Sequence, residues 1–125
     1  SVLFGCGGDR DRGKRPEMAA IAERYAHKIY VTEDNPRTED SVQIFSDIIK
    51  GFSSDASYSV IRSRKQAIQQ AITQAADNEI LMILGKGHET YQEIGTIRHH
   101  FDDREEARNA LHAHASAMKK AGGAP

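Results

Sequence analysis

The chain has 125 residues, of which 38% are hydrophobic and 28% charged, and its 17 basic and 18 acidic residues give a formal net charge of −1. This size and composition fit one globular domain, and nothing in them suggests a second. The even charge balance excludes a strongly basic nucleic-acid-binding protein, whose affinity would depend on neutralising phosphates. Any anion-binding site must therefore be local.

Membrane, export and disulfide signals are missing from the sequence. The longest apolar run, residues 80–84, is far shorter than the roughly 18 residues that a membrane span requires. The first residues carry neither the charged region nor the cleavage signal of a secretory peptide. A single cysteine, Cys6, excludes an internal disulfide and favours a reducing compartment. We therefore expect a cytoplasmic protein with no membrane and no nucleic-acid partner.

Four short apolar runs predict β-strands. They cover residues 2–4, 28–31, 58–61 and 80–84. The first and last are continuous enough to be buried on both faces, as parallel strands are.

Three segments between these strands repeat apolar residues with the helical period, and each can cover one face of a sheet. The apolar stripes are Met18, Ile21, Ala22 and Tyr25, then Val42, Phe45, Ile48 and Ile49, then Ile68, Ala71, Ile72 and Ala75. Pro16 suits a first helical turn, and Asp40 before Gln43 and Ser63 before Gln66 have the capping-box spacing.

The C-terminal part predicts a hairpin and a helix. Residues 91–98 can turn near Gly95, Asp102 with Glu105 opens a helix through Leu111, and residues 122–125 should fray. The whole order predicts an α/β fold, because parallel neighbours need crossover connections. We expect a Rossmann-like, mostly parallel sheet with helices on both faces and a C-terminal hairpin.

Polar, glycine-rich segments follow three of the predicted strands. Residues 5–15, 32–40 and 85–89 come directly after the first, second and fourth strands. All three therefore leave the carboxyl edge of the sheet, where open α/β sheets bind ligands.

The first of these segments places glycines between a strand and a helix, as a phosphate cradle does. The dinucleotide fingerprint fails, because Arg10 stands where its third glycine would be. A flexible turn is the alternative interpretation. Arg10 and Arg12 favour an anion-binding role.

The third segment is Gly85-Lys86-Gly87-His88-Glu89. It is not a Walker loop, because Gly87 follows the lysine where Ser or Thr is required, and it does not begin a zincin motif. Lys86 and His88 either shape the tight turn or contact a ligand, and the sequence favours neither interpretation. The other histidines are spaced as ordinary surface residues, so we expect no metal site.

The second segment contains Asp34-Asn35-Pro36-Arg37. Pro36 stiffens a loop that presents an amide and a guanidinium together, and such a pair recognises a carboxylate well. A solvated turn explains the local pattern equally well. Together the three loops offer cationic donors and the acid Glu89, which suits a small zwitterion better than a nucleotide.

At these residues the sequence resembles the C-terminal domain of the Mur ligases, and most closely the diaminopimelate-adding MurE type. The resemblance spans nearly the whole chain. Its carriers, in order, are FGCGGDRD at 4–11, KRP at 14–16, TEDNPRTE at 32–39, GKGHE at 85–89 with YQ at 91–92, and FDDRE at 101–105.

The resemblance implies that this domain binds the incoming amino acid, meso-diaminopimelate. Asn35 and Arg37 would hold the side-chain carboxylate that lysine lacks, and Arg10 would contact the same molecule. Gly85 and Glu89 would complete the pocket, with the acid paired to the distal ammonium. The loop that contains the first two of these residues distinguishes diaminopimelate-adding from lysine-adding relatives. No catalytic residue and no metal ligand are implied within the chain.

The resemblance also implies an ATP-dependent ligase of peptidoglycan synthesis. In that family a central domain binds ATP and Mg²⁺ and activates the carboxylate of UDP-MurNAc-L-Ala-D-Glu, which the amine of the amino acid then attacks. We expect residues 1–125 to be an excised, inactive C-terminal domain without the N-terminal and central domains. Its own first strand-helix unit would be absent, which predicts a bare sheet edge or an uncovered apolar surface. The rival hypothesis is a stand-alone α/β module that binds an anionic metabolite or nucleotide.

Overall fold

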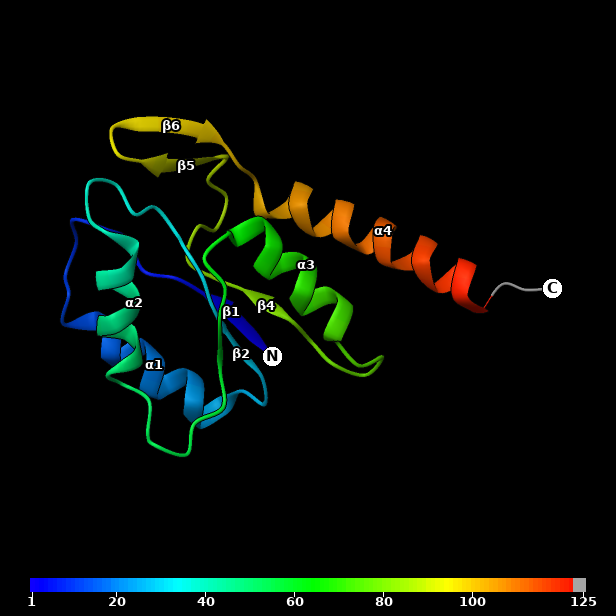
Figure 1. Ribbon diagram of the computed structural model, residues 1–125, viewed down its shortest axis with the longest axis horizontal. Coiled ribbons are helices and arrows are strands. Elements are labelled where there is room, and N and C mark those ends of the chain that lie inside the picture. The colour runs from blue at the N-terminus through cyan, green and yellow to red at the C-terminus, as the bar shows by residue number, and fades with distance from the viewer. Residues whose placement is uncertain (123–125) are drawn as a thin grey trace.

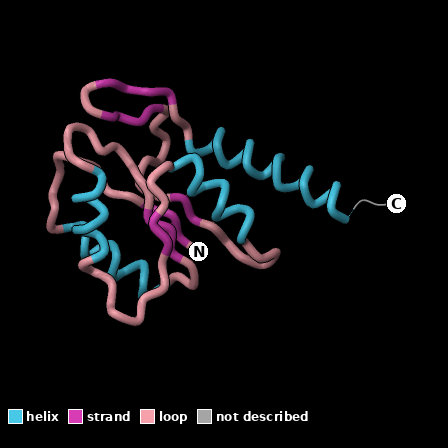
Figure 2. Tube along the Cα trace, viewed as in Figure 1, coloured by secondary structure: helices cyan, strands magenta, loops and turns pink. Residues whose placement is uncertain are grey.

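The computed structural model describes residues 1–122 as an α/β fold with a separate hairpin (Figure 1, Figure 2). The elements in chain order are β1 Val2–Phe4, α1 Lys14–Tyr25, β2 Ile29–Val31, α2 Ser41–Ile49, β3 Ser59–Val60, α3 Arg64–Gln74, β4 Met82–Ile83, β5 Tyr91–Ile94, β6 Ile97–His100 and α4 Asp103–Gly122.

The first four strands form one parallel sheet in the order β3-β2-β1-β4. In this sheet Leu3 pairs with Tyr30 on one side and with Ile83 on the other. Helices α1 and α2 lie on one face, and α3 and α4 lie on the other (Figure 1). The predicted fold class is confirmed, and β1 has the predicted bounds, whereas β2, β3 and β4 are shorter than the apolar runs that predict them.

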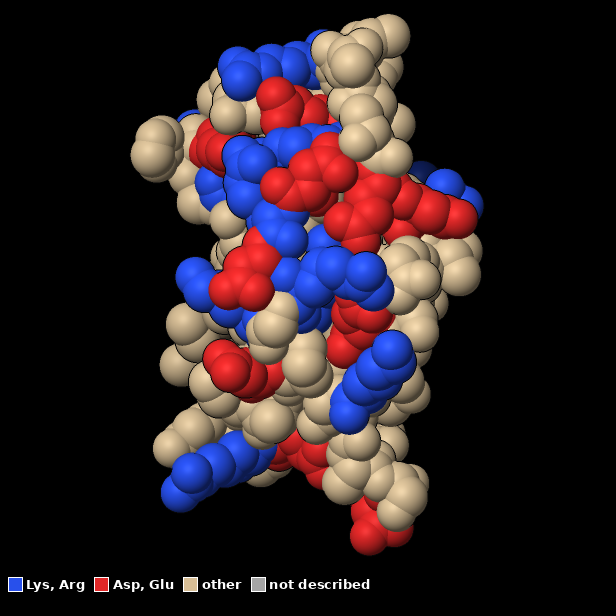
Figure 3. Space-filling view, turned by 90° about the vertical axis from the view of Figure 1, so that its left-hand side faces the viewer, with Lys and Arg blue, Asp and Glu red and all other residues tan. Residues whose placement is uncertain are grey.

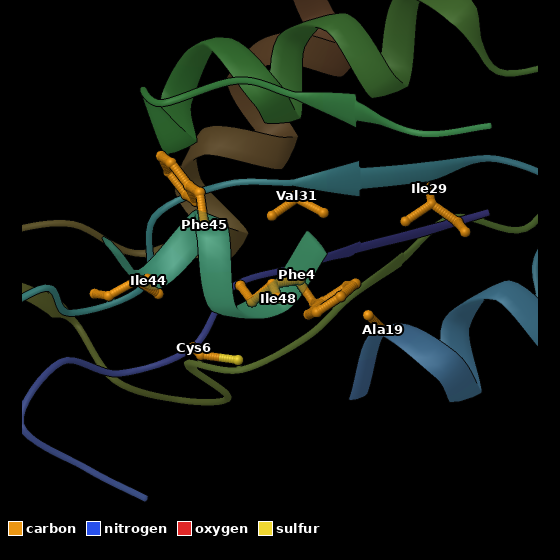
Figure 4. Packing of buried hydrophobic residues seen from close by; sticks show 8 residues of the cluster. All are labelled: Phe4, Cys6, Ala19, Ile29, Val31, Ile44, Phe45 and Ile48. Atoms are coloured by element: carbon orange, nitrogen blue, oxygen red, sulfur yellow. The ribbon is translucent and has the colours of Figure 1, made fainter. Parts of the chain in front are cut away.

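Two apolar cores fill the space between the sheet and its helices. On the α1–α2 face, Phe4, Val31 and Ile48 are fully or almost fully buried (Figure 4). On the α3–α4 face, Leu3, Ile68 and neighbouring alanines pack together. Successive strand residues point to opposite faces, so Leu3 and Phe4 enter different cores.

The predicted helix starts and stripes are partly confirmed. The Asp40 side chain accepts a hydrogen bond from the Val42 backbone N–H, and the Ser63 side chain accepts one from Gln66. In the α3 stripe Ile68, Ala71 and Ile72 are buried as predicted, whereas Ala75 follows the helix and is half-buried; in α2 Ile44 takes the buried place expected for Val42. Helix α4 continues past Leu111 to Gly122, and the rest of the predicted frayed end lies outside the described residues.

Two predictions of burial are wrong. Strand β4 is an edge strand, and Met82 in it is exposed where burial on both faces was expected. The prediction for the α1 stripe is wrong in part, because Met18 and Ala22 pack against the core but Ile21 and Tyr25 are 60% and 75% exposed. These side chains line one apolar groove of about 490 Å³. The bare edge and uncovered apolar surface expected from the resemblance are therefore both present among the described residues.

The hairpin of β5 and β6 lies beside the carboxyl edge of the sheet, over the loops that follow β1 and β2 (Figure 1). It turns at Gly95, whose φ of +64° suits glycine, as the sequence predicts. An isolated bridge between Arg37 and Ile94 attaches it to the loop after β2. Within residues 1–122, no helix has the length and apolar character to span a membrane.

Candidate functional site

The loops after β1 and β2 pack directly against each other. The Gly8 backbone N–H donates to the Asn35 carbonyl oxygen over 2.7 Å. A Cβ at Gly8 would collide with the carbonyl group of Pro36, so the close approach requires glycine. Gly8 is thus explained by the packing of the two loops.

Arg37 has a left-handed backbone, with φ of +53°, which is uncommon for a residue with a side chain. The hairpin holds it there. The Arg37 N–H donates to the Glu93 carbonyl oxygen over 3.0 Å, and the Gly95 N–H donates to the Arg37 carbonyl oxygen over 2.7 Å. Backbone conformations of this kind persist where the surroundings enforce them, and they concentrate at functional sites.

The Arg37 side chain is only partly free for a ligand. Its Nε donates to Oε2 of Glu93 over 2.8 Å, and Nη1 donates to the Gly8 carbonyl oxygen over 3.0 Å. Among the described residues, Nη2 has no hydrogen-bond partner, and the side chain is 18% exposed. The guanidinium is therefore fixed on one side and available on the other.

Asn35 and Glu89 form the floor of the site. Asn35 is buried, and its Nδ2 lies 3.4 Å from Oε1 of Glu89. The Tyr91 hydroxyl donates to Oε2 of Glu89 over 3.1 Å. Lys86 Nζ donates to Oδ1 of Asn35 over 3.1 Å, and the Glu93 backbone N–H donates to the same oxygen over 3.0 Å, so the loops after β2 and β4 meet the hairpin at this amide.

Arg10 is exposed beside Arg37. A Cβ at Gly7 would lie 2.9 Å from Arg37 Nη1 and 3.4 Å from Arg10 Cγ, so the two side chains flank the same glycine. Among the described residues, the Arg10 guanidinium contacts only the neighbouring Asp9 carbonyl oxygen. Both arginines are thus within the span of one small ligand.

A polar pocket of about 380 Å³ joins these side chains. Its lining residues are Asp9, Arg10, Arg37, Thr38, Glu89, Tyr91, Glu93, Gly95 and Arg98. Three of the five predicted site residues line it, namely Arg10, Arg37 and Glu89, and Asn35 lies directly behind Glu89. Gly85 does not line it, because it packs against Asp34, where a side chain would meet the buried carboxyl group.

Sequence reasoning missed the hairpin side of the pocket. Glu93 accepts hydrogen bonds from Arg37 and, over 2.9 Å, from Nε of Arg98. The guanidinium of Arg98 also lies over the ring of Tyr91, 4.2 Å from its centre. The strand alternation places Tyr91 and Glu93 on one face of β5, which is a signal in the sequence, but it does not say what that face meets.

The charges of the pocket are balanced. Arg10, Arg37 and Arg98 face Asp9, Glu89 and Glu93, and acidic and basic side chains are interspersed on this side of the molecule (Figure 3). The pKa of Glu93 is lowered mainly by the hydrogen bond from Arg98. Hydrogen bonds from Thr38 likewise lower the pKa of Asp9. These two acids are therefore ionised near neutral pH.

Comparisons with known proteins agree on one family. The model for "Mur ligase, glutamate ligase domain" matches residues 1–87. The UDP-N-acetylmuramoyl-L-alanyl-D-glutamate--2,6-diaminopimelate ligase of Parasynechococcus marenigrum is 58% identical over 109 residues, and the ligase of the same name from Pseudomonas aeruginosa is 55% identical over 111 residues. These alignments cover 87% and 89% of this chain.

A solved structure gives the same result. A UDP-N-acetylmuramoyl-L-alanyl-D-glutamate--2,6-diaminopimelate ligase matches with a TM-score of 0.87 and 49% sequence identity over 91% of this chain. The match covers 24% of that protein, and the two sequence alignments cover 22% and 23% of the relatives. The chain therefore spans less than a quarter of the length of the proteins it is similar to.

Proposed function

The chain belongs to the Mur ligase family, and from this premise we propose that residues 1–125 are the C-terminal, amino-acid-binding domain of a longer ATP-dependent ligase. The proposed reaction joins meso-diaminopimelate to UDP-MurNAc-L-Ala-D-Glu through an amide bond, a step of peptidoglycan synthesis. The names of the relatives support this reaction, and the small share of their length that the chain covers supports a domain of a larger enzyme.

The single observation that carries the proposal is the charge pattern of the polar pocket. It is lined by three guanidinium groups and three carboxylates, within about 380 Å³. Diaminopimelate has two carboxylates and two amino groups, so it offers both kinds of partner. Lysine lacks one of the two carboxylates and would leave a guanidinium without its anion.

Arg37 and Asn35 would bind the distal carboxylate. The outward Nη2 of Arg37 carries two N–H donors, because the other side of the guanidinium is held by Glu93 and Gly8. The Nδ2 group of Asn35, 3.4 Å from Oε1 of Glu89, would add a second donor. Arg10, which is exposed and lacks an acidic partner among the described residues, would contact the same amino acid.

Glu89 would pair with the distal ammonium. Its carboxylate accepts hydrogen bonds from Asn35 and from Tyr91, and these fix its position at the pocket wall. A carboxylate held in this way presents its remaining lone pairs to a cation. The other amino group would then face outward, toward the carboxylate that it attacks in the longer enzyme.

The resemblance assigns ATP and Mg²⁺ to activation of the muropeptide carboxylate, mainly in the central domain of the longer ligase. Lys86 is buried and donates to Asn35 and to the Tyr91 carbonyl oxygen, so it cannot reach a phosphate. No group of three or more His, Cys, Asp or Glu side chains within residues 1–122 could hold a metal ion. We therefore assign both to the central domain of the longer ligase, and amino-acid binding and orientation to this chain.

Arg37→Ala in the full-length ligase tests the proposal. The substitution should lower kcat/KM for diaminopimelate. The loss should correspond to roughly 2–5 kcal/mol of transition-state stabilisation, the range for truncating one partner of a buried charged pair. Any activity with lysine should change much less, because lysine has no distal carboxylate. Steady-state kinetics with both amino acids measure the difference.

Arg108→Ala is the matched control, because Arg108 is an exposed arginine of α4 and does not line the pocket. It should leave both activities unchanged. Equal losses for the two amino acids in Arg37→Ala would contradict the assignment of Arg37 to the distal carboxylate. A wild-type ligase that does not use diaminopimelate would overturn the proposed function as a whole.

A further inference from the structure

Lys86 is a buried cation that the proposed binding scheme does not use. Its side chain is completely shielded from solvent, and it does not line the polar pocket. Its Nζ donates to Oδ1 of Asn35 over 3.1 Å and to the backbone carbonyl oxygen of Tyr91. Oε1 of Glu89 lies 3.9 Å away. A buried ammonium is tolerated only when such acceptors surround it.

Asn35 Oδ1 receives a second donor from the hairpin. The Glu93 backbone N–H points at the same oxygen over 3.0 Å. A backbone N–H can only donate, and so can the Lys86 ammonium, whose Nζ is surrounded by acceptor atoms. An amide turned by 180° would therefore place its NH₂ group against two donors. The two hydrogen bonds leave Asn35 only one favourable orientation.

In that orientation the donor end of Asn35 faces Glu89 at the pocket wall. Nδ2 lies 3.4 Å from Oε1 of Glu89, a residue that lines the pocket. Without the ammonium, the oxygen would keep one donor, and the amide would gain freedom to rotate. Burial lowers the pKa of Lys86, while the nearby carboxylates of Asp34 and Glu89 oppose that shift.

We propose that Lys86 is a positioning residue for the amino-acid pocket, because it holds the Asn35 side chain with its NH₂ group toward the ligand. The inference rests on the proposed function, since it concerns the same diaminopimelate site. It assigns no ligand contact to Lys86 itself, which distinguishes it from a direct binding role.

Lys86→Met in the full-length ligase tests this inference. The substitution removes the charge and keeps an unbranched apolar stem. The KM for diaminopimelate should rise about 10-fold to 100-fold, as expected when a buried hydrogen-bonded group loses its partner. The kcat and the KM values for ATP and the muropeptide should stay within about twofold. Lys65→Met, at an exposed lysine of α3, is the control and should change none of them.

A double-mutant cycle separates positioning from direct binding. If Lys86 acts through Asn35, Lys86→Met should add almost nothing in an Asn35→Ala background. Losses that multiply in the double variant would overturn the inference, as would an unchanged KM for diaminopimelate or a raised KM for ATP. Lys86→Gln, which can still donate to Oδ1 of Asn35, should recover part of the loss.

Separate controls distinguish a folding defect, a failure of this inference and a failure of the proposed function. If Lys86→Met fails to fold, the cycle is run with Lys86→Gln, and multiplying losses overturn the inference in the same way. If Arg37→Ala weakens diaminopimelate use and Lys86→Met does not, this inference fails and the proposed function stands. If the wild-type ligase does not add diaminopimelate, both fail together.

Discussion

Glu93 is a carboxylate shared by two guanidinium groups at the rim of the pocket. It accepts from Nε of Arg37 over 2.8 Å and from Nε of Arg98 over 2.9 Å. One negative charge between two positive charges gives these three side chains a net positive charge, although the charges of the pocket as a whole are balanced. Glu93 therefore orients Arg37 without neutralising the pair.

We predict that Glu93→Ala in the full-length ligase lowers kcat/KM for diaminopimelate by about tenfold, because Arg37 loses the hydrogen bond that fixes its guanidinium. Glu93→Gln keeps an acceptor oxygen and should lose less. Steady-state kinetics give both values, with Glu17→Ala at an exposed position of α1 as the control. A higher kcat/KM in Glu93→Ala would mean that Glu93 competes with the substrate carboxylate for Arg37.

At the residue scale, the sequence predicts the pocket from one side only. Arg10, Arg37 and Glu89 follow strands of one parallel sheet, and topology alone brings such loops to one edge. Glu93 and Arg98 belong to a hairpin outside that sheet. The position of the hairpin depends on backbone hydrogen bonds to Arg37. No pattern in the sequence predicts these hydrogen bonds.

At the scale of elements, an ion-pair network connects α1 to α2. Arg15 is fully buried, and its Nη1 donates to Glu39 over 2.5 Å and to Asp47 over 2.9 Å. Arg12 binds the same Asp47 carboxylate. The hydrogen bonds from Arg12 hold the pKa of Asp47 well below its usual value, and the hydrogen bond from Arg15 lowers that of Glu39.

We predict that this network makes the stability of the chain depend on acid pH. A folded-state pKa below the unfolded value means that unfolding takes up protons, so the contribution is complete above about pH 5 and is lost as the pH falls below about 4. Thermal melts from pH 7 to pH 2 should show a falling midpoint. Asp47→Asn should lower the midpoint at pH 7 and flatten the dependence.

The control is Asp55→Asn, at an exposed residue outside the network. Its midpoint should follow the wild-type curve at every pH. Parallel curves for wild type and Asp47→Asn would show that the acid sensitivity arises elsewhere in the chain.

The apolar pattern predicts burial correctly for an element that lies between two neighbours. It predicts burial wrongly for an element at the edge of the fold. The α3 stripe of Ile68 and Ala71 is buried between the sheet and α4. Met82 and Tyr25 have equally apolar patterns, yet they line an open groove. Periodicity identifies the apolar face of an element, but the neighbour that covers this face is a property of the assembled fold.

At the scale of the whole molecule, Arg64 ties three parts of the fold together. Its Nε and Nη2 bind both carboxylate oxygens of Asp103, over 2.8 and 2.7 Å, at the start of α4. Its other hydrogen bonds go to the carbonyl oxygens of Glu33, after β2, and Leu84, after β4. The Arg64 side chain is completely buried.

We predict that Asp103→Ala lowers the free energy of unfolding by roughly 3–5 kcal/mol, the range for removing one partner of a buried ion pair. The reason is that the guanidinium of Arg64 would remain buried without its anion. Chemical denaturation of the 125-residue chain measures the change. Asn109→Ala, at an exposed position of the same helix, should cost far less, and a similar loss in both variants would contradict this role of the pair.

The β5–β6 hairpin contributes no side chain to either apolar core within residues 1–122. Hydrogen bonds to Arg37, Asn35 and Asp34 hold it in place. An element attached in this way opens at a lower free energy than the sheet does. We therefore expect the pocket to have a closed, binding-competent population and an open one, with an apparent dissociation constant equal to the intrinsic one divided by the closed fraction. On this expectation, a substitution at Gly95, whose φ of +64° suits glycine, would weaken binding by lowering the closed fraction rather than by removing a ligand contact.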